Sequence, residues 1–220
     1  MNIFYLYRKF KADLTDTRRN SQNFNLALHI RMWIFEYILR LDTVKAGFMW
    51  TSYPLHQFLD SLNLENKSVL EFGSGGSTAF FLKRKAILHT FEHSQEWINK
   101  LKCKMGRRPN WQPLLVKYVS REVDNSGFIH YFEGIKDIDE SSLDLVLVDG
   151  RHRVECIRAV ISKVKPEGYI ILDDSDRESY KESSLILKSW KSFVISGNAY
   201  MSDFKTQSTV WKKPEISSSC

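Results

Sequence analysis

Carboxylates end four short apolar runs of this sequence, at Glu71, Glu92, Asp149 and the adjacent pair Asp173 and Asp174. A single acid at the end of a strand is unremarkable. Acids that follow several parallel strands would gather at one edge of the sheet, because the carboxyl ends of those strands share that edge. Oxygens in such a position can hold ligand hydroxyls, an ammonium group or a divalent cation. The sequence therefore predicts a polar functional site at the carboxyl edge of a sheet.

A glycine-rich turn follows the first of these acids. Residues 69–72 predict a buried strand, residues 73–76 include three glycines, and Ser77 or Thr78 is expected to cap the next helix. Glycines let a backbone approach a ligand closely. The turn lacks the GxGxxG spacing of dinucleotide-binding proteins and the Lys-Ser/Thr pair of a phosphate-binding loop. The glycines alone therefore leave the ligand open.

Two acids narrow the choice of ligand. Glu92 lies 92 minus 73, or 19, residues after Gly73, where an acid can accept both ribose hydroxyls of an adenosine-type ligand. Its alternative role is that of an acid favoured by the dipole of the helix predicted at 94–105, and the glycine turn makes the ribose role preferable. Glu71 would repel a phosphate and attract an ammonium group, which favours a ligand with an amino-acid part.

The elements that must position these acids alternate along the chain. Further strands are predicted at 87–92, 114–119, 143–149, 169–173, 193–196 and 208–212. Helices are predicted at 26–41, 54–64, 77–85, 94–105, 154–164 and 182–190. Pro166 and Gly168 are expected to end the fifth helix, and segment 121–142 breaks the alternation with a turn at 125–127 and a candidate short strand at 128–132. The pattern predicts an α/β fold, a parallel sheet with helices on both faces.

Composition sets outer limits on function. The 220 residues carry 32 Lys and Arg against 26 Asp and Glu, a net charge of +6, and three widely spaced cysteines. The cysteines argue against a disulfide framework or a structural zinc, so the cytoplasm is the expected location. No segment has the pattern of a signal peptide or a membrane span. Many basic residues lie in 83–108, where a solvated helix face is favoured over an anion-binding patch.

The motifs together resemble a known family. LEFGSGGST with Glu71, the strand-end Glu92, LVLVDG and the later ILDD are similar to the class I S-adenosylmethionine-dependent methyltransferases, from about Lys67 to the C-terminal strands. The sequence DGRH at 149–152, followed by two aspartates, resembles the metal-dependent O-methyltransferases of the macrocin type, which act on sugar hydroxyls. The resemblance implies a Rossmann-like, seven-stranded, mostly parallel sheet in the order 3-2-1-4-5-7-6, with the last strand antiparallel. It also implies an N-terminal helical extension at 1–48, acting as a lid, a packing element or a dimer helix, and a methyltransferase domain at 49–220.

The resemblance also implies roles for single residues. The expected S-adenosylmethionine-binding residues are Glu71, Gly73, Ser74, Gly75, Gly76, Ser77, Glu92, His93 and Asp149. The expected Mg²⁺ ligands are Asp149, Asp173 and Asp174. The cation would lower the pKa of a hydroxyl group on the acceptor. His152 would be the general base, and Asp149 is the second expected catalytic residue.

Other interpretations of the same residues stay open. Asp173 and Asp174 would also suit a turn, and Arg151 and Arg153, which flank His152, would suit a carboxylate or phosphate on the substrate. A small-molecule or glycan acceptor is expected. The first alternative is a metal-independent nucleic-acid methyltransferase that uses the basic run 100–108 and Trp111 as a stacking surface. The second is a non-catalytic cofactor-binding protein whose helix at 26–41 docks a partner. Independently of these alternatives, a homodimer through the N-terminal helix is a candidate assembly.

Overall fold

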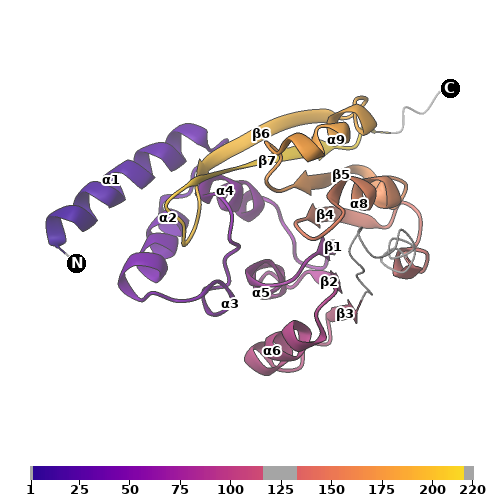
Figure 1. Ribbon diagram of the computed structural model, residues 1–220, viewed down its shortest axis with the longest axis horizontal. Helices are drawn as coiled ribbons and strands as arrows, with labels where there is room; N and C mark the ends of the chain where they lie inside the picture. Colours follow the sequence, from indigo (N-terminus) through magenta and orange to yellow (C-terminus); the bar gives the residue numbers. More distant parts are fainter. Residues whose placement is uncertain (1, 116–132, 216–220) are drawn as a thin grey trace.

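A seven-stranded sheet forms the centre of the molecule (Figure 1). The computed structural model describes residues 2–115 and 133–215. The strands are β1 (Ser68–Phe72), β2 (Ile87–Glu92), β3 (Trp111–Leu115), β4 (Leu143–Val148), β5 (Val164–Leu172), β6 (Lys191–Asn198) and β7 (Lys205–Lys212). Their order is β3-β2-β1-β4-β5-β7-β6, and only β7 runs antiparallel to its neighbours. The order and direction implied by the family resemblance are confirmed.

Helices cover both faces of this sheet, as the alternation predicts. One face packs against α4 (Tyr53–Ser61), α5 (Gly76–Lys83) and α6 (Gln95–Met105), and the other against α8 (Arg153–Val160) and α9 (Glu182–Ile186). Successive residues of one strand enter opposite layers, because side chains alternate across a sheet: Val69 lies in the first core cluster and Leu70 in the second. Both core layers therefore hold the central strands in place.

The N-terminal region is helical and packs onto the main body. It consists of α1 (Ile3–Asn20), α2 (Leu26–Trp33) with a π-helical continuation at Ile34–Ile38, and α3 (Thr43–Ala46). Leu28 and Met32 of α2 belong to the first core cluster. In α1, Asp13 accepts a 2.7 Å hydrogen bond from the Asn198 side chain, and Asp16 accepts a 3.0 Å bond from the Asn198 backbone N–H. These contacts fix the C-terminal half of α1 against β6 (Figure 1).

Several predicted boundaries are wrong, and local chemistry explains them. The helix expected at 154–164 ends at Val160, and Pro166 and Gly168 lie inside β5. Pro166 is tolerated there because it lies where the pairing of β4 with β5 shifts register, between the pairs Leu143–Val164 and Leu145–Tyr169, and a proline at such an irregularity interrupts no regular ladder. The tail helix is shorter than expected and ends at Ile186.

The N-cap of α5 also differs from the prediction. The cap is Gly75, and the Oγ1 atom of Thr78, in the first turn, accepts a 3.0 Å hydrogen bond from the Gly75 N–H. β3 starts three residues earlier than predicted, and residues 116–119, the turn at 125–127 and the strand at 128–132 lie outside the described residues. In the described part of the chain, no helix has the length and apolar character needed to cross a membrane.

Candidate functional site

A cavity of about 510 Å³ opens at the carboxyl ends of β1, β2 and β4. The strand order reverses between β1 and β4, which pair in parallel with Phe72 beside Val148. Ligands of open α/β sheets bind at such a reversal. Eight of the nine predicted cofactor residues line the cavity: Gly73, Ser74, Gly75, Gly76, Ser77, Glu92, His93 and Asp149. The ninth, Glu71, lies fully buried beneath it.

The turn after β1 requires glycine at two positions for different reasons. Gly73 has a φ of +85°, and a Cβ atom there would stand 3.1 Å from the backbone oxygen of Asp149. At Gly76 a Cβ atom would stand 1.9 Å from the backbone oxygen of Phe48. The first glycine permits the left-handed turn, and the second permits close contact with the N-terminal region. The indole N–H of Trp97 donates a 2.9 Å bond to the Ser74 carbonyl and supports the turn from the side.

Glu71 is held by three hydroxyl groups. Its carboxylate accepts hydrogen bonds from Ser77 (2.6 Å), Thr78 (2.5 Å) and Thr90 (2.7 Å). Burial raises the pKa of Glu71 to about 7, and these three bonds oppose the rise. Because Ser77 also lines the cavity, the carboxylate lies one side chain below the ligand space.

Glu92 fixes the turn and the start of α6 together. One carboxylate oxygen accepts bonds from the Ser74 N–H (3.1 Å) and hydroxyl (2.7 Å), and the other from the N–H groups of His93 (2.8 Å) and Ser94 (3.0 Å). The side-chain oxygen of Ser94 in turn caps α6 by accepting a bond from the Trp97 N–H. The position of Glu92 is therefore compatible with both predicted roles, binding of ribose hydroxyls and stabilisation of the start of α6.

One wall of the cavity is formed by Thr43, at the start of α3, and by Met49 and Trp50, between α3 and α4. The fully buried His56 holds the backbone of this wall: it accepts a 2.9 Å bond from the Met49 N–H and contacts the Ser52 carbonyl at 2.9 Å through its other ring nitrogen. Trp50 is nevertheless 61% exposed. Sequence reasoning missed this wall, because no motif marks it.

The three aspartates expected to bind a metal do come together. Asp149, Asp173 and Asp174 each offer a carboxylate oxygen, and these atoms lie within 4.8 Å of one another. Asp173 is tied down by hydroxyl groups from distant segments, since its Oδ1 accepts bonds from Thr51 (2.9 Å) and Ser208 (2.6 Å). Burial and the neighbouring carboxylates raise the pKa of Asp173, and its hydroxyl partners oppose the rise.

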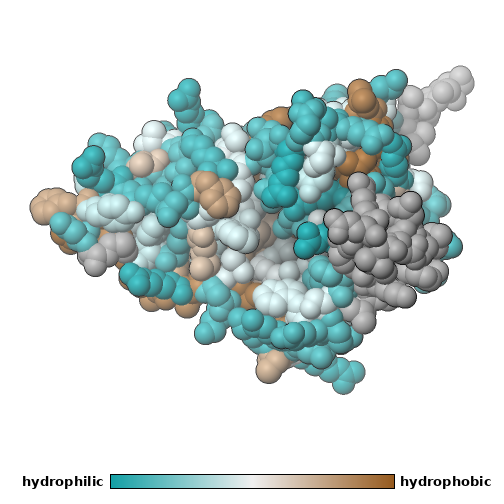
Figure 2. Space-filling model, viewed as in Figure 1, coloured by the Kyte–Doolittle hydropathy of each residue, from teal (hydrophilic) through white to brown (hydrophobic). Residues whose placement is uncertain are grey.

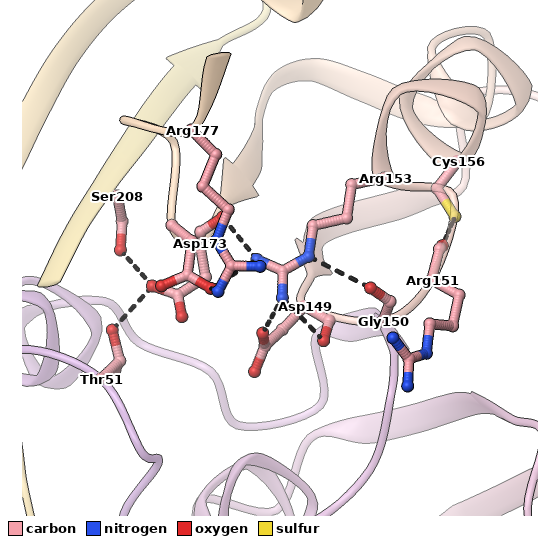
Figure 3. Close-up of polar contacts among 10 residues, drawn as sticks. Thr51, Asp149, Gly150, Arg151, Arg153, Cys156, Asp173, Arg177 and Ser208 are labelled. Carbon is pink, nitrogen blue, oxygen red and sulfur yellow. Dashed lines mark hydrogen bonds and ion pairs between the residues drawn. The ribbon is translucent and has the colours of Figure 1, made fainter. Parts of the chain in front are cut away.

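A guanidinium group lies among these acids (Figure 3). Arg153, the first residue of α8, donates to the Asp149 carboxylate at 2.8 Å and to the Asp173 carbonyl at 2.6 Å, and lies 3.4 Å from the Asp174 carboxylate. Arg177 pairs with Asp174 from the outer side at 2.6 Å. A hard divalent cation at the centre of the three carboxylates would meet the positive charge of Arg153. The site as it stands does not fit Mg²⁺, although its donor atoms are of the right type.

Asp149 faces both the cavity and this cluster. Its side chain is 44% exposed. The surrounding protein still shields the carboxylate from much of the solvent, and this desolvation, with the Asp173 charge, raises the pKa of Asp149, while the Arg153 charge opposes the rise. His152 takes a left-handed conformation, φ +51°, at the start of α8 and is not among the residues that line the cavity. Arg151 does line it. The structure therefore brings Asp149, and not His152, to the cavity surface.

Comparisons with known proteins identify the fold. No protein-family model and no curated protein sequence match this chain. Among solved structures, the precorrin 8w decarboxylase of Methanobacterium thermoautotrophicum matches with a TM-score of 0.54 and 17% identity, covering 74% of this chain and 90% of its own. The precorrin-6y C5,15-methyltransferase of Geobacter metallireducens matches with a TM-score of 0.52 and 16% identity, covering 75% and 90%.

A third structure contains the expected cofactor. Aeropyrum pernix fibrillarin, in complex with natively bound S-adenosyl-L-methionine, matches with a TM-score of 0.52 and 15% identity, covering 71% of each chain. At these identities the likeness shows the fold, that of the class I S-adenosylmethionine-dependent methyltransferases. The comparisons give no support to the narrower macrocin type.

Proposed function

We propose that this chain transfers a methyl group from S-adenosylmethionine to a hydroxyl group of a sugar or another small polar acceptor. The observation that carries the proposal is the cavity at the reversal of strand order, where the glycine turn and Glu92 meet above the buried Glu71. Its volume of about 510 Å³ lies within the range of small-molecule sites, roughly 300–1,000 Å³. The solved fibrillarin complex with S-adenosylmethionine supports the same cofactor on this fold.

Each part of the cofactor has a chemically suitable partner. The methionine part would lie along the turn 73–76, where the glycines allow close approach, and its ammonium group would be attracted by Glu71. Glu92 would accept the ribose hydroxyls in exchange for the Ser74 hydroxyl that it now holds. An adenosine ligand with an amino-acid part accounts for both acids, whereas a dinucleotide would place phosphate near Glu71.

The chemistry needs a proton acceptor near the acceptor hydroxyl. S-adenosylmethionine, when bound, supplies an electrophilic methyl group on a sulfonium. The hydroxyl oxygen would attack that carbon while the electrons of the carbon–sulfur bond leave with sulfur. The Asp149 carboxylate would take the hydroxyl proton, because it lines the cavity and its pKa is raised. His152 remains the second candidate base, and its use would require a movement at the start of α8.

The transfer can be tested with S-adenosylmethionine that carries tritium in its methyl group. We expect label to enter a member of a panel of sugars and small polyols, and Asp149→Asn to lower the rate by about 100-fold or more. Asp144→Asn is the matched control, because Asp144 lies at the other end of β4 and pairs with Lys165. Failure of every acceptor to gain label, with cofactor bound, would contradict the catalytic proposal and favour a non-catalytic cofactor-binding protein.

The nucleic-acid alternative loses one of its two supports. Trp111, expected to stack on bases, is only 7% exposed and donates its indole N–H to Thr90 in the core. The basic run at 100–108 remains on the surface around α6, beside a cavity that includes Lys102, Arg107 and Arg108. A small polar acceptor is therefore favoured over a nucleic acid.

A further inference from the structure

We infer that Arg153 is a built-in cation that takes the place of a divalent metal at the acid cluster, so that this chain works without a metal ion. The inference concerns the site of the proposed function and rests on it for its catalytic meaning. The sequence motif predicts a metal ion here instead, because the three aspartates match the positions of metal ligands. The contacts of the guanidinium group carry the argument.

Every nitrogen of the Arg153 guanidinium has an acceptor in this cluster. Nε donates to the Gly150 carbonyl at 3.1 Å. One terminal nitrogen donates to the Asp173 carbonyl at 2.6 Å and lies 3.4 Å from the Asp174 carboxylate, and the other bonds the Asp149 carboxylate at 2.8 Å. Figure 3 shows the group lying between the end of β4 and the end of β5. The planar group thus bridges the two strand ends that a shared metal would bridge.

The guanidinium is also enclosed. The Arg153 side chain is 8% exposed, and the ring of Tyr180 lies 5.3 Å from its central carbon. An arginine keeps its charge under all conditions in which the protein is folded, so this position cannot become neutral to admit a metal. Moving it into water would break all of these bonds and leave Asp149 and Asp174 without their shared partner.

The place of Arg153 in its helix points the same way. It is the first residue of α8, where the helix dipole disfavours a positive charge. The acids at the ends of β4 and β5 offset that disadvantage, which indicates that they hold the arginine there. Arg177 adds a second positive charge at Asp174 from an exposed position. Three carboxylates therefore face two guanidinium groups, and the residual charge is too small to favour a dication at their centre.

Manganese binding tests this inference without any acceptor. Mn²⁺ is titrated into the full chain, with S-adenosylmethionine present, and free Mn²⁺ is counted by electron paramagnetic resonance. We expect the wild type to show no stoichiometric site, and Arg153→Ala to bind one Mn²⁺ at least about 100-fold more tightly, because its three carboxylates then face one another. Arg177→Ala is the matched control: it also removes a positive charge next to Asp174, but it leaves the centre filled and should gain no site.

Two outcomes would overturn the inference. One is a stoichiometric Mn²⁺ site in the wild type that Asp149→Asn abolishes. The other is a folded Arg153→Ala protein that gains no site, which would mean that the arginine does not stand in for a metal. If Arg153→Ala fails to fold, the wild-type titration, with Asp149→Asn beside it, still decides. Cofactor binding measured calorimetrically on the same wild-type sample separates a failure of the proposed function from a failure of this inference.

Discussion

Glu71 is a fully buried carboxyl group whose pKa rises to about 7 because burial disfavours its charge. Since the folded protein then binds the proton more tightly than the unfolded chain, the free energy of unfolding should fall as pH rises from about 4.5 through 7. The full effect is on the order of 3 kcal/mol, from 1.36 kcal/mol per pKa unit. The three hydroxyl donors would hold either protonation state.

We predict that Glu71→Gln removes this component of the pH dependence. Urea unfolding of both proteins at pH 5 and pH 8 measures it: the loss of stability between the two pH values should be smaller in the variant by up to about 3 kcal/mol. Equal losses in the two proteins would show that Glu71 keeps an ordinary pKa despite its burial.

The ligand ammonium should act on the same carboxyl group. A positive charge placed near Glu71 favours its ionised form, so cofactor binding at pH 6 to 7 should release protons. Calorimetry of S-adenosylmethionine binding in two buffers with different ionisation enthalpies measures the release. It should disappear in Glu71→Gln. Proton release that persists unchanged in the variant would assign the linkage to another group.

At the level of the elements, the His56 side chain holds the segment between α3 and α4. The neutral His56 ring bonds the Met49 N–H and faces the Ser52 carbonyl, and burial lowers its pKa to about 3. We predict that His56→Ala loosens this wall of the cavity. It should lower the free energy of unfolding by about 2 kcal/mol and weaken cofactor binding several-fold, because a buried N–H loses its partner.

Thermal unfolding of the variant measures the loss of stability, and calorimetry measures its affinity for the cofactor. His89→Ala serves as the control, because His89 lies in the middle of β2 and does not line the cavity. If His56→Ala were destabilised with unchanged cofactor affinity, the wall would have no part in ligand binding.

The elements of the sheet were predictable because each is encoded locally. Apolar runs that end in acids mark β1, β2, β4 and β5, and parallel strands bring those ends to one edge. Within the N-terminal helical extension implied by the family resemblance, only the helix at 26–41 was located from the sequence, and α1 was not. Only Asp13 and Thr17 of this helix are buried, and its position depends on hydrogen bonds that Asp13 and Asp16 accept from Asn198, more than 180 residues away in the chain.

The parts of the candidate site that local motifs encode were likewise predictable. The turn and Glu92 follow from local motifs, but the bond from Thr51 to Asp173 joins residues 122 apart and has no local signal. From the sequence, Arg153 was expected only to flank His152 and, with Arg151, to suit a carboxylate or phosphate on the substrate. Its contacts depend on the direction in which the first turn of α8 points, for which the sequence has no local signal.

At the scale of the whole molecule, apolar side chains gather at the free end of α1. Ile3 is 75% exposed, Phe4 73% and Tyr7 64%, and this end carries brown residues in the space-filling view (Figure 2). A dimer through the N-terminal helices would cover them, which is one of the roles predicted for residues 1–48. We predict that the chain is a dimer and that replacing Phe4 and Tyr7 by Ser makes it monomeric.

Light scattering coupled to size-exclusion chromatography, over a range of concentrations, gives the mass in solution. The monomeric variant should keep the fold of its parent, as judged by circular dichroism, because these side chains are exposed within a single chain. A wild-type mass of 25.8 kDa at every concentration would contradict the dimer.

We expect the cavity above Glu71 to bind S-adenosylmethionine through the glycine turn and Glu92. Calorimetric titration of the wild type, of Glu92→Ala and of Glu96→Ala tests it most directly, because Glu96 is an exposed acid in the first turn of α6 and offers the same change of charge nearby. We predict one site in the wild type and in Glu96→Ala, and an affinity at least about tenfold lower in Glu92→Ala. Well-folded wild-type protein that binds no S-adenosylmethionine at high micromolar concentration would contradict the account.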